Sequence, residues 1–251
     1  MLKHKIRAVF FDIGGTLDDR TTDIDRASYA VWKFLMKKNI KTDFQQLRTD
    51  LAQGFKAYQK CSMRTKSEPS SEYLWRHIML KKRSIFARGH QFPFSKLSDI
   101  FETAYYGKKL RKNVRITLGI LRRKKLRLGC ISNTILSQHQ FVKILKEYHI
   151  DSYFDVITLS SKIGKKKPHP KIFQHALKRC GVSAKQAAFV GDTLSRDISG
   201  AKKAGFAVAI QIKSSLSAQK DVNYSGVKPD FVISKIEEVI PILLSPTVIE
   251  T

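Results

Sequence analysis

VFFDIGGTLDD, residues 9–19, is the most informative stretch of this chain. Its apolar and aromatic start is typical of a buried β-strand, and that strand ends on Asp12. Gly14 and Gly15 follow, and two glycines in succession predict a tight turn. The stretch therefore predicts a buried strand that delivers a carboxylate to a loop at the edge of a sheet.

The second half of the chain alternates between strand and helix patterns. Strands are expected at residues 126–133, 154–160, 187–192, 206–212 and 230–234, and helices at 114–125, 138–150, 169–181, 197–205 and 235–244. Such alternation predicts an α/β fold with a doubly wound, mostly parallel sheet of the Rossmann-like kind, covered by helices on both faces. Ligands of these sheets bind at the carboxyl ends of the strands.

The segment between residues 19 and 107 has a helical pattern instead. It is rich in helix formers and places aromatic residues, Trp32 and Trp75 among them, where a helical core would need them. Four helices are expected, at residues 23–40, 43–60, 71–88 and 94–107. Asp23 and Ser95 are the expected N-caps of the first and the last. This composition predicts a compact helical insert within the α/β fold.

Polar and charged side chains follow the predicted strands at one edge of the sheet. They are Asp12, Ser132, Asn133, Asp192 and Asp197, with a run of three lysines at residues 165–167. A carboxylate can attack phosphorus and form a covalent intermediate. Several oxygen ligands suit Mg2+, and a hydroxyl and a lysine can hold the charge of a phosphate. The edge is therefore suited to phosphoryl transfer.

Four segments in this order resemble the motifs of the haloacid dehalogenase superfamily. They read DIGGTL, ISN, GKKKPHPKIF and GDTLSRDISGAKKAG, and the resemblance covers nearly the whole chain. It implies a core domain formed by residues 1–18 and 108–251. Residues 19–107 would then form a helical cap domain of the kind that closes over the site and selects the substrate.

The resemblance also implies a role for each site residue. Asp12 matches the nucleophile, and Lys167 matches the motif lysine because it directly precedes Pro168. Ser132 and Asn133, with Lys167, match the groups that bind the substrate phosphate. Mg2+ is the implied cofactor, with a ligand set of Asp12, the backbone carbonyl of Gly14, Asp192 and Asp197. Asp197 is either a second acidic ligand or an orienting partner.

Gly14 departs from the pattern of the family's phosphatases, which carry a second Asp there as general acid and base. Proton transfer of this kind contributes about 10^2 to 10^4-fold to a rate. One explanation is an acid from elsewhere: Asp18 or Asp19 nearby, a residue of the cap, or the substrate itself. A second is a dehalogenase or a phosphonatase reaction, the latter needing a cap lysine such as Lys33, Lys37 or Lys56. A third is a degenerate enzyme now used for binding.

The reading that these residues favour is an atypical Mg2+-dependent phosphohydrolase that acts on a small phosphorylated metabolite. The alternative is a catalytically weakened protein that binds anions or nucleic acid. The net charge of +26 suits anionic partners, and no Asp or Glu occurs from residue 103 to 146. A solvated basic surface explains the same charge.

Other features of the composition narrow the class of protein. Cys61, Cys130 and Cys180 are widely spaced and form no zinc pattern. No apolar stretch approaches the roughly 20 residues that span a bilayer, so insertion into a membrane is not expected and the cytoplasm is the expected location.

Overall fold

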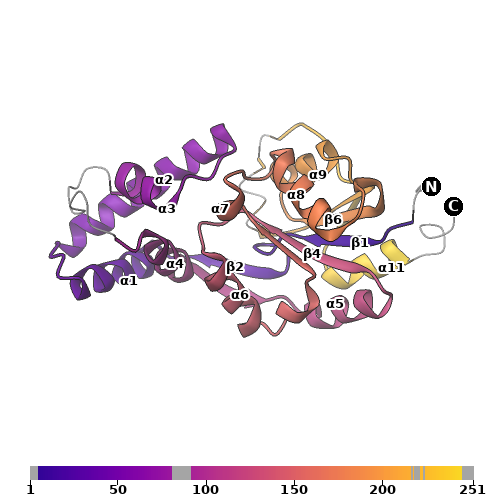
Figure 1. The fold of residues 1–251 in the computed structure, drawn as a ribbon, viewed down its shortest axis with the longest axis horizontal. Coiled ribbons are helices and arrows are strands. Elements are labelled where there is room, and N and C mark those ends of the chain that lie inside the picture. The colour runs from indigo at the N-terminus through magenta and orange to yellow at the C-terminus, as the bar shows by residue number, and fades with distance from the viewer. Residues whose placement is uncertain (1–4, 81–91, 216, 218–220, 223, 245–251) are drawn as a thin grey trace.

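The computed structural model describes residues 5–80, 92–215, 217, 221, 222 and 224–244. Its centre is a six-stranded, fully parallel sheet in the order β5-β4-β1-β6-β7-β8 (Figure 1). The strands are β1 (Ala8–Phe11), β4 (Arg127–Ser132), β5 (Val156–Leu159), β6 (Ala187–Gly191), β7 (Val208–Ile212) and β8 (Phe231–Ile233). Because β1 lies between β4 and β6, the residues that follow these three strands meet at one edge.

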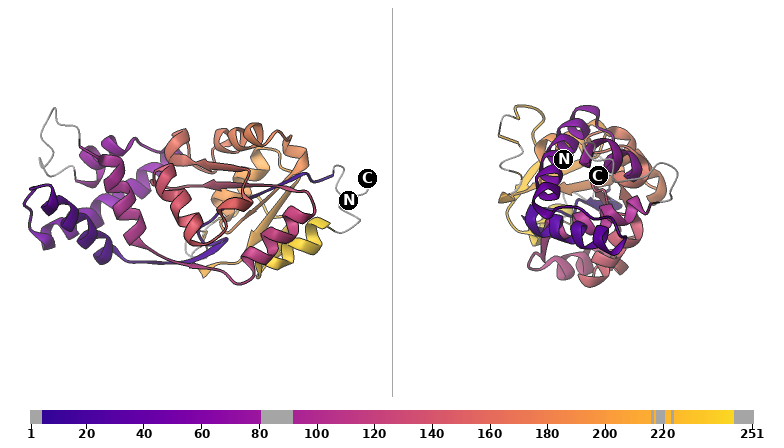
Figure 2. Two further views of the ribbon diagram at one scale, coloured as in Figure 1. Left: turned by 60° about the horizontal axis from the view of Figure 1, so that its bottom comes forward. Right: turned by 90° about the vertical axis from the view of Figure 1, so that its left-hand side faces the viewer.

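Helices cover both faces of the sheet, which confirms the Rossmann-like α/β prediction (Figure 2). Successive β1 side chains point to opposite faces, as a pleated strand requires. Val9 and Phe11 pack in one core with α5 (Val114–Arg123), α6 (Gln138–Glu147) and α11 (Val239–Leu244). Ala8 and Phe10 pack in another with α8 (Pro170–Cys180) and α9 (Ser199–Lys203). Short helical segments complete the connections: η2 (Asp151–Tyr153), α7 (Ser160–Ile163), η3 (Ala184–Gln186), η4 (Leu194–Ile198) and η5 (Ile236–Glu238).

A layer of helices, here called the helical layer, is formed by the described residues 24–80 and 92–105 beyond one end of the sheet (Figure 1). Its elements are α1 (Ile24–Lys37), α2 (Phe44–Thr65), α3 (Ser71–Tyr73), η1 (Leu74–Met79) and α4 (Phe94–Tyr105). They enclose a separate apolar core in which Trp75 and Phe101 are fully buried. Trp32 is only partly buried and packs at the margin of that core. The predicted helical character of this segment is confirmed for the described residues.

The ends of the helices agree with the prediction only in part. Asp23 caps α1 as predicted, since its side chain accepts a hydrogen bond from the Arg26 amide at 2.8 Å. The prediction that Ser95 caps the last helix is wrong, because α4 already begins at Phe94, directly after Pro93. The predicted helix over 71–88 is α3 and η1 as far as Met79, and its part from residue 81 lies outside the described residues.

A pair of antiparallel strands joins the helical layer to the sheet, and the sequence did not predict it. The pair is called the hairpin below, although the whole helical layer lies between its two strands. It pairs β2 (Asp18–Thr22) with β3 (Tyr106–Leu110), from Asp18 opposite Leu110 to Thr22 opposite Tyr106. β2 begins only six residues after Asp12, so side chains of the hairpin lie close to the carboxyl edge of the sheet.

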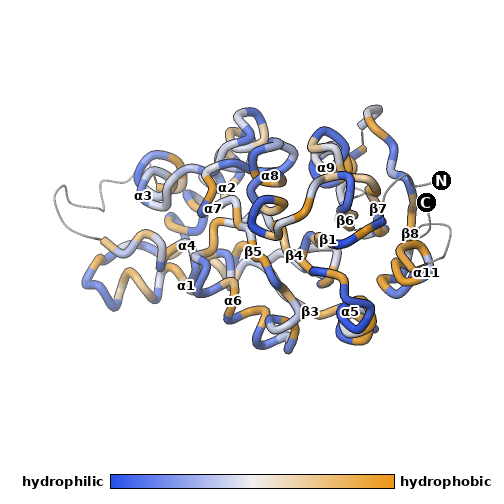
Figure 3. The backbone as a smooth tube through the Cα atoms, turned by 45° about the vertical axis from the view of Figure 1, so that its right-hand side comes forward, coloured by the Kyte–Doolittle hydropathy of each residue, from blue (hydrophilic) through white to orange (hydrophobic). Residues whose placement is uncertain are grey.

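Apolar and polar positions alternate along the helices that pack on the sheet (Figure 3). None of the helices within the described ranges combines the length and the apolar character that crossing a membrane requires. All three cysteines are free thiols, and Cys130 and Cys180 are buried.

Candidate active site

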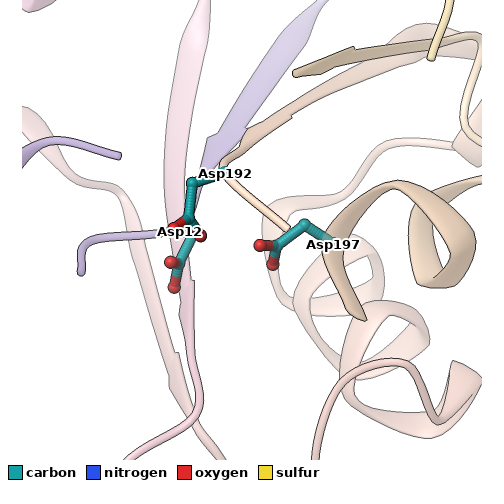
Figure 4. A group of neighbouring side chains, drawn as sticks. All are labelled: Asp12, Asp192 and Asp197. Atoms are coloured by element: carbon teal, nitrogen blue, oxygen red, sulfur yellow. The ribbon is translucent and has the colours of Figure 1, made fainter. Parts of the chain in front are cut away.

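Three buried aspartates meet at the carboxyl edge of the sheet. Asp12 follows β1 and Asp192 follows β6, and these strands are hydrogen-bonded neighbours. Asp197 lies in η4, the π-helical turn after β6, and faces the other two (Figure 4). One oxygen from each carboxylate lies within 4.8 Å of the others. The fold therefore brings together the three acidic residues that the sequence assigned to one metal site.

Lys167 connects two of these carboxylates. Its Nζ lies 2.7 Å from an oxygen of Asp12 and 2.7 Å from an oxygen of Asp197, and it donates to the carbonyl of Ile131 at 2.8 Å. Only 2% of the lysine side chain is exposed. Thr193 holds the other oxygen of Asp197 through its amide, at 3.0 Å, and its hydroxyl, at 2.5 Å. These contacts fix the position of the lysine relative to the predicted nucleophile.

Burial and mutual charge shift the proton affinities of this group. Burial would raise the pKa of Asp197, but Lys167 and Arg196 outweigh it and lower the pKa overall. Burial would lower the pKa of Lys167, yet Asp12 and Asp197 raise it. For Asp12 burial is the largest effect and raises the pKa, with Lys167 opposing it. Lys167 is therefore a cation held between carboxylates, and the cluster keeps an excess of negative charge.

Ser132 and Asn133 lie beside the aspartates, as their position after β4 predicted. Both line a cavity of about 240 Å³ together with Asp12, Gly14 and Lys167. The amide group of Asn133 is engaged at both ends, since its oxygen accepts from the Lys167 amide at 2.8 Å and its nitrogen donates to the Lys167 carbonyl at 3.1 Å. Asn133 therefore positions the backbone of Lys167, while its contact with a substrate phosphate stays a prediction.

Arg20 occupies the space beside Gly14. A Cβ atom built on Gly14 would lie 2.3 Å from Cζ of the guanidinium, and that guanidinium lines the cavity. Arg20 is held by Asp18, whose oxygen accepts from Nε at 2.9 Å, and it stacks 4.9 Å above the ring of Tyr106. Burial would lower the pKa of Arg20, but Asp18 and Tyr106 raise it well above its usual value. Arg20 is therefore a permanent cation beside position 14, where the family's phosphatases carry the Asp that acts as general acid.

The alternative acids suggested by the sequence are placed unfavourably. Asp18 is fully buried and accepts from Arg20 Nε and from the Tyr148 hydroxyl at 3.2 Å. Asp19 is 64% exposed, pairs with Arg111 and lies outside the cavity that Asp12 lines. Neither carboxyl therefore faces the nucleophile in this arrangement.

The cap lysines considered for a phosphonatase reaction are also distant from the cavity. Lys33, Lys37 and Lys56 are all exposed, and none of them lines the cavity around Asp12. Imine formation needs a lysine that reaches the substrate, so the described arrangement gives this reaction no support.

The other two lysines of the 165–167 run contact the helical layer. Lys165 donates to the Ser67 hydroxyl at 3.0 Å. Lys166 donates to the Tyr58 hydroxyl at 2.7 Å and forms an ion pair with Glu68 at 3.3 Å. Burial lowers the pKa of Lys166, and Glu68 opposes this shift. These contacts attach the helical layer to the loop that carries Lys167.

A second, larger cavity of about 540 Å³ lies between the helical layer and the sheet edge. Phe55, Tyr58 and Met63 supply apolar surface from α2, while Lys166 and Arg196 supply positive charge. It shares Asn133, Lys167, Tyr106 and Arg196 with the smaller cavity. The arrangement offers room for an organic group beside the predicted phosphate site.

Four residues of this region were not identified from the sequence. Arg20 and Arg196 line the cavity, and Glu68 and Glu102 fasten the helical layer to the sheet. Glu68 accepts from the Ser160 hydroxyl at 2.6 Å. Glu102 accepts from the hydroxyl of Thr134 at 2.6 Å, in the loop after β4. Glu102 and the two arginines carry no local sequence signal, because their contacts depend on segments far apart in the chain.

The basic run at residues 122–125 lies away from this cavity. It begins in the last turn of α5 and ends shortly before Arg127, the first residue of β4, whereas the aspartates lie beyond the carboxyl ends of the strands. Arg122 is already paired with Asp155 at 2.6 Å. The run and the candidate active site therefore occupy opposite edges of the sheet.

Comparison with known proteins supports the family to which the motifs point. A family model described as haloacid dehalogenase-like hydrolase matches residues 6–205. The glyceraldehyde 3-phosphate phosphatase of Methanopyrus kandleri is 29% identical over 245 residues, which cover 95% of this chain and 97% of that protein.

Two solved structures share the fold over most of their length. A HAD phosphatase from Thermococcus onnurineus superposes with a TM-score of 0.61, and a 2-haloacid dehalogenase from Pseudomonas syringae pv. Tomato DC3000 with 0.64. Each is 23% identical, and each comparison covers 95% of this chain and 98% of the other. The fold alone thus accommodates both reactions. On the match across residues 6–205 and the arrangement of its motifs, this chain belongs to the haloacid dehalogenase-like hydrolases.

Proposed function

We propose that this protein is a Mg2+-dependent phosphatase that acts on a small phosphorylated metabolite through an aspartyl-phosphate. The observation that carries the proposal is the position of Lys167, held between Asp12 and Asp197 beside a cavity that Ser132 also lines. The similarity to a glyceraldehyde 3-phosphate phosphatase supports a phosphate monoester as substrate. Arg20 and Arg196 line the same cavity and offer positive charge to a phosphorylated ligand.

The residues present fit a divalent cation. Lys167 pairs with two of the three buried carboxylates, so the group keeps a net negative charge for a cation to neutralise. We assign Asp12, Asp192 and Asp197 as its acidic ligands, with the carbonyl of Gly14 as a further oxygen. Bound Mg2+ would supply charge neutralisation between the nucleophile and the substrate phosphate.

In the proposed reaction, a carboxylate oxygen of Asp12 attacks phosphorus and the bond to the leaving oxygen breaks. Lys167 and Ser132 hold the phosphate oxygens as charge develops on them. Water then attacks the aspartyl-phosphate, the bond between phosphorus and Asp12 breaks, and the phosphate product keeps the water's protons. Asp12 returns as a carboxylate.

The helical layer has the role of a cap in this proposal. Residues 19–107 would form the cap domain, and residues 1–18 and 108–251 the catalytic core. Side chains of α2, which belongs to the helical layer, line the larger cavity, so they would contact the organic part of the substrate. When the helical layer opens and closes over the site, the chain would bend at β2 and β3.

Phosphate release from a panel of phosphate monoesters tests the proposal, with and without Mg2+. Asp12→Asn should abolish Mg2+-dependent turnover while the protein stays folded. Asp19→Asn is the matched control, because this exposed carboxylate lies outside the cavity, and it should retain the native rate. Turnover by Asp12→Asn equal to that of the native protein would remove the mechanism.

Absence of turnover on the whole panel and on acetyl phosphate would favour the binding alternative instead. Nucleic-acid binding would then weaken steeply as salt rises, and neutralising residues 122–125 would weaken it further. Release of halide from 2-haloacids without phosphatase turnover would point to dehalogenation.

A further inference from the structure

The space that a side chain at position 14 would use is filled by another residue's cation. A Cβ atom on Gly14 would meet Arg20 at three atoms, Cζ at 2.3 Å, Nε at 2.4 Å and Nη1 at 2.7 Å. Gly14 lies two residues after Asp12, and both line the same cavity as Arg20. The guanidinium of Arg20 therefore takes up the space that a side chain at position 14 would need.

The guanidinium is held in place from two sides. Asp18 accepts from its Nε at 2.9 Å, and the ring of Tyr106 lies 4.9 Å below it on the opposite strand of the hairpin. Asp18 is itself fixed, since it also accepts from the Gly15 amide at 3.3 Å and from the Tyr148 hydroxyl at 3.2 Å. Only 12% of the Arg20 side chain is exposed. Its charge is therefore directed into the cavity by a rigid setting.

A guanidinium and a carboxyl would treat a leaving group differently. A carboxylic acid can give its proton to the departing oxygen, whereas a guanidinium keeps its protons and can only stabilise the oxygen as an anion. Donation from a fixed cation to an oxyanion is a strong, charge-assisted contact. A site with Arg20 in this place should therefore handle leaving groups that are stable as anions.

We propose that Arg20 is a specificity-determining residue that receives the leaving oxygen as an anion, and that the substrate class is phosphoryl compounds with acidic leaving groups, typified by acyl phosphates. This inference rests on the proposed phosphatase function. In the first step the bond between phosphorus and Asp12 forms, and the bond to the leaving oxygen breaks with its electron pair. The leaving group departs unprotonated and paired with Arg20. Hydrolysis of the aspartyl-phosphate then restores Asp12 as described above.

Kinetics of the native protein provide the first test, with acetyl phosphate and a series of aryl phosphates as substrates. The series runs from nitrophenols to unsubstituted phenol, whose pKa is about 10, like that of tyrosine. Without a general acid, kcat/KM should fall steeply as the leaving group becomes more basic, because it reports the first step, whereas kcat also contains the hydrolysis of the aspartyl-phosphate that all substrates share. The loss at the basic end should be of the order of the ~10^2 to 10^4-fold that proton transfer contributes.

Variants provide the second test. The double substitution Gly14→Asp with Arg20→Ala replaces the cation by a carboxyl, and it should flatten the dependence by raising turnover of phenyl phosphate relative to acetyl phosphate by roughly 10^2-fold. Arg20→Ala alone should lower kcat/KM without flattening its dependence on the basicity of the leaving group, and Arg20→Lys should restore part of kcat/KM. Arg196→Ala is the matched control, because this arginine lines the same cavity and should change KM but not the slope.

The outcomes separate this inference from the function on which it rests. Loss of all turnover in Asp12→Asn, with equal kcat/KM for acidic and basic leaving groups in the native protein, would retain the phosphatase and overturn the role of Arg20. A double variant with a slope as steep as that of Arg20→Ala would also overturn it. Native turnover that does not depend on Asp12 would overturn the phosphatase mechanism and this inference together.

Discussion

Lys167 is the cation that neutralises the carboxylate cluster, so its loss should strongly destabilise the metal-free protein. Its Nζ lies 2.7 Å from both Asp12 and Asp197, in a side chain that is 2% exposed. Lys167→Met keeps the length of the side chain but leaves these two aspartates and Asp192 close together without that charge. Removing one partner of a buried ion pair costs about 3–5 kcal/mol.

Thermal unfolding at pH 7 without divalent cations measures this cost. For a chain of this length each kcal/mol lowers Tm by about 2–4 °C, so Lys167→Met should unfold roughly 6–20 °C below the native protein. Lys202→Met is the matched control, because it removes a partly exposed pair with Asp230. Pairs near the surface contribute about 0–1 kcal/mol, so this variant should stay close to the native Tm.

The effect of pH on the same variant has a defined sign. In the native protein the pKa of Asp197 is below its ordinary 3.8, so the stability from its ion pair is present above that value and is lost only as pH falls through the lowered pKa. In Lys167→Met, burial and repulsion would raise the carboxyl pKa values, and protonation would relieve the cost. The difference in Tm should therefore narrow from pH 7 towards pH 4, and Mg2+ should narrow it too. An unchanged Tm at pH 7, or a difference that widens in acid, would refute this reasoning.

Substitutions at three other positions have defined expectations. His169 caps α8 by accepting from the Lys171 amide at 3.1 Å, and burial with nearby lysines lowers its pKa below 6.5. Its stabilisation, about 1 kcal/mol, is present above pH 6.5 and is lost as pH falls through the lowered pKa, so Tm should drop over this range in the native protein but not in His169→Gln. Glu102→Ala removes the acceptor of two buried donors in the loop after β4 and should cost about 1–3 kcal/mol per donor in urea unfolding, a loss that Glu102→Gln would partly recover. Gly15→Ala places a Cβ 2.3 Å from a carboxylate oxygen of Asp192 at φ +84°, and it should lose more than about 1 kcal/mol and weaken protection by Mg2+ against heat; equal urea midpoints would contradict this expectation.

The sheet and its edge were predictable because their strands are buried on both faces. The strands β1, β4 and β6 read as short apolar runs, and each run is followed by a polar residue. A parallel sheet then brings Asp12, Ser132 and Asp192 to one edge regardless of the details of packing. Lys167 was identified through the motif, and its ion pairs with Asp12 and Asp197 agree with that assignment.

Neither the hairpin nor the environment of Arg20 could be predicted from the sequence. Its strands read DDRTT and YGKKL, which lack the apolar alternation that marks a half-buried strand. Their pairing depends on 83 residues of intervening chain that bring Thr22 opposite Tyr106. Locally, Arg20 is only a charged residue after two aspartates, and its approach to Gly14 exists only once the turn has formed.

The N-cap of α4 shows the same dependence on a neighbouring residue. Ser95 is a good capping type, but Pro93 suits the start of a helix because its ring fixes φ and it has no amide to satisfy. The helix therefore begins before the serine, which becomes part of its first turn.

The chain enters and leaves the helical layer at two residues that pair with each other across the antiparallel strands β2 and β3. Thr22 and Tyr106 lie opposite one another, and the amide of Asp23 donates to the carbonyl of Tyr105 at 2.8 Å. A segment whose two ends are neighbours can be exchanged for another without altering the path of the flanking chain. Such a graft would replace the cavity wall that α2 provides but would leave Arg20 on its strand. Selectivity for the organic part of the substrate would thus depend on the helical layer, and selectivity for the acidity of the leaving group on the strand that carries Arg20. The two selectivities could change independently.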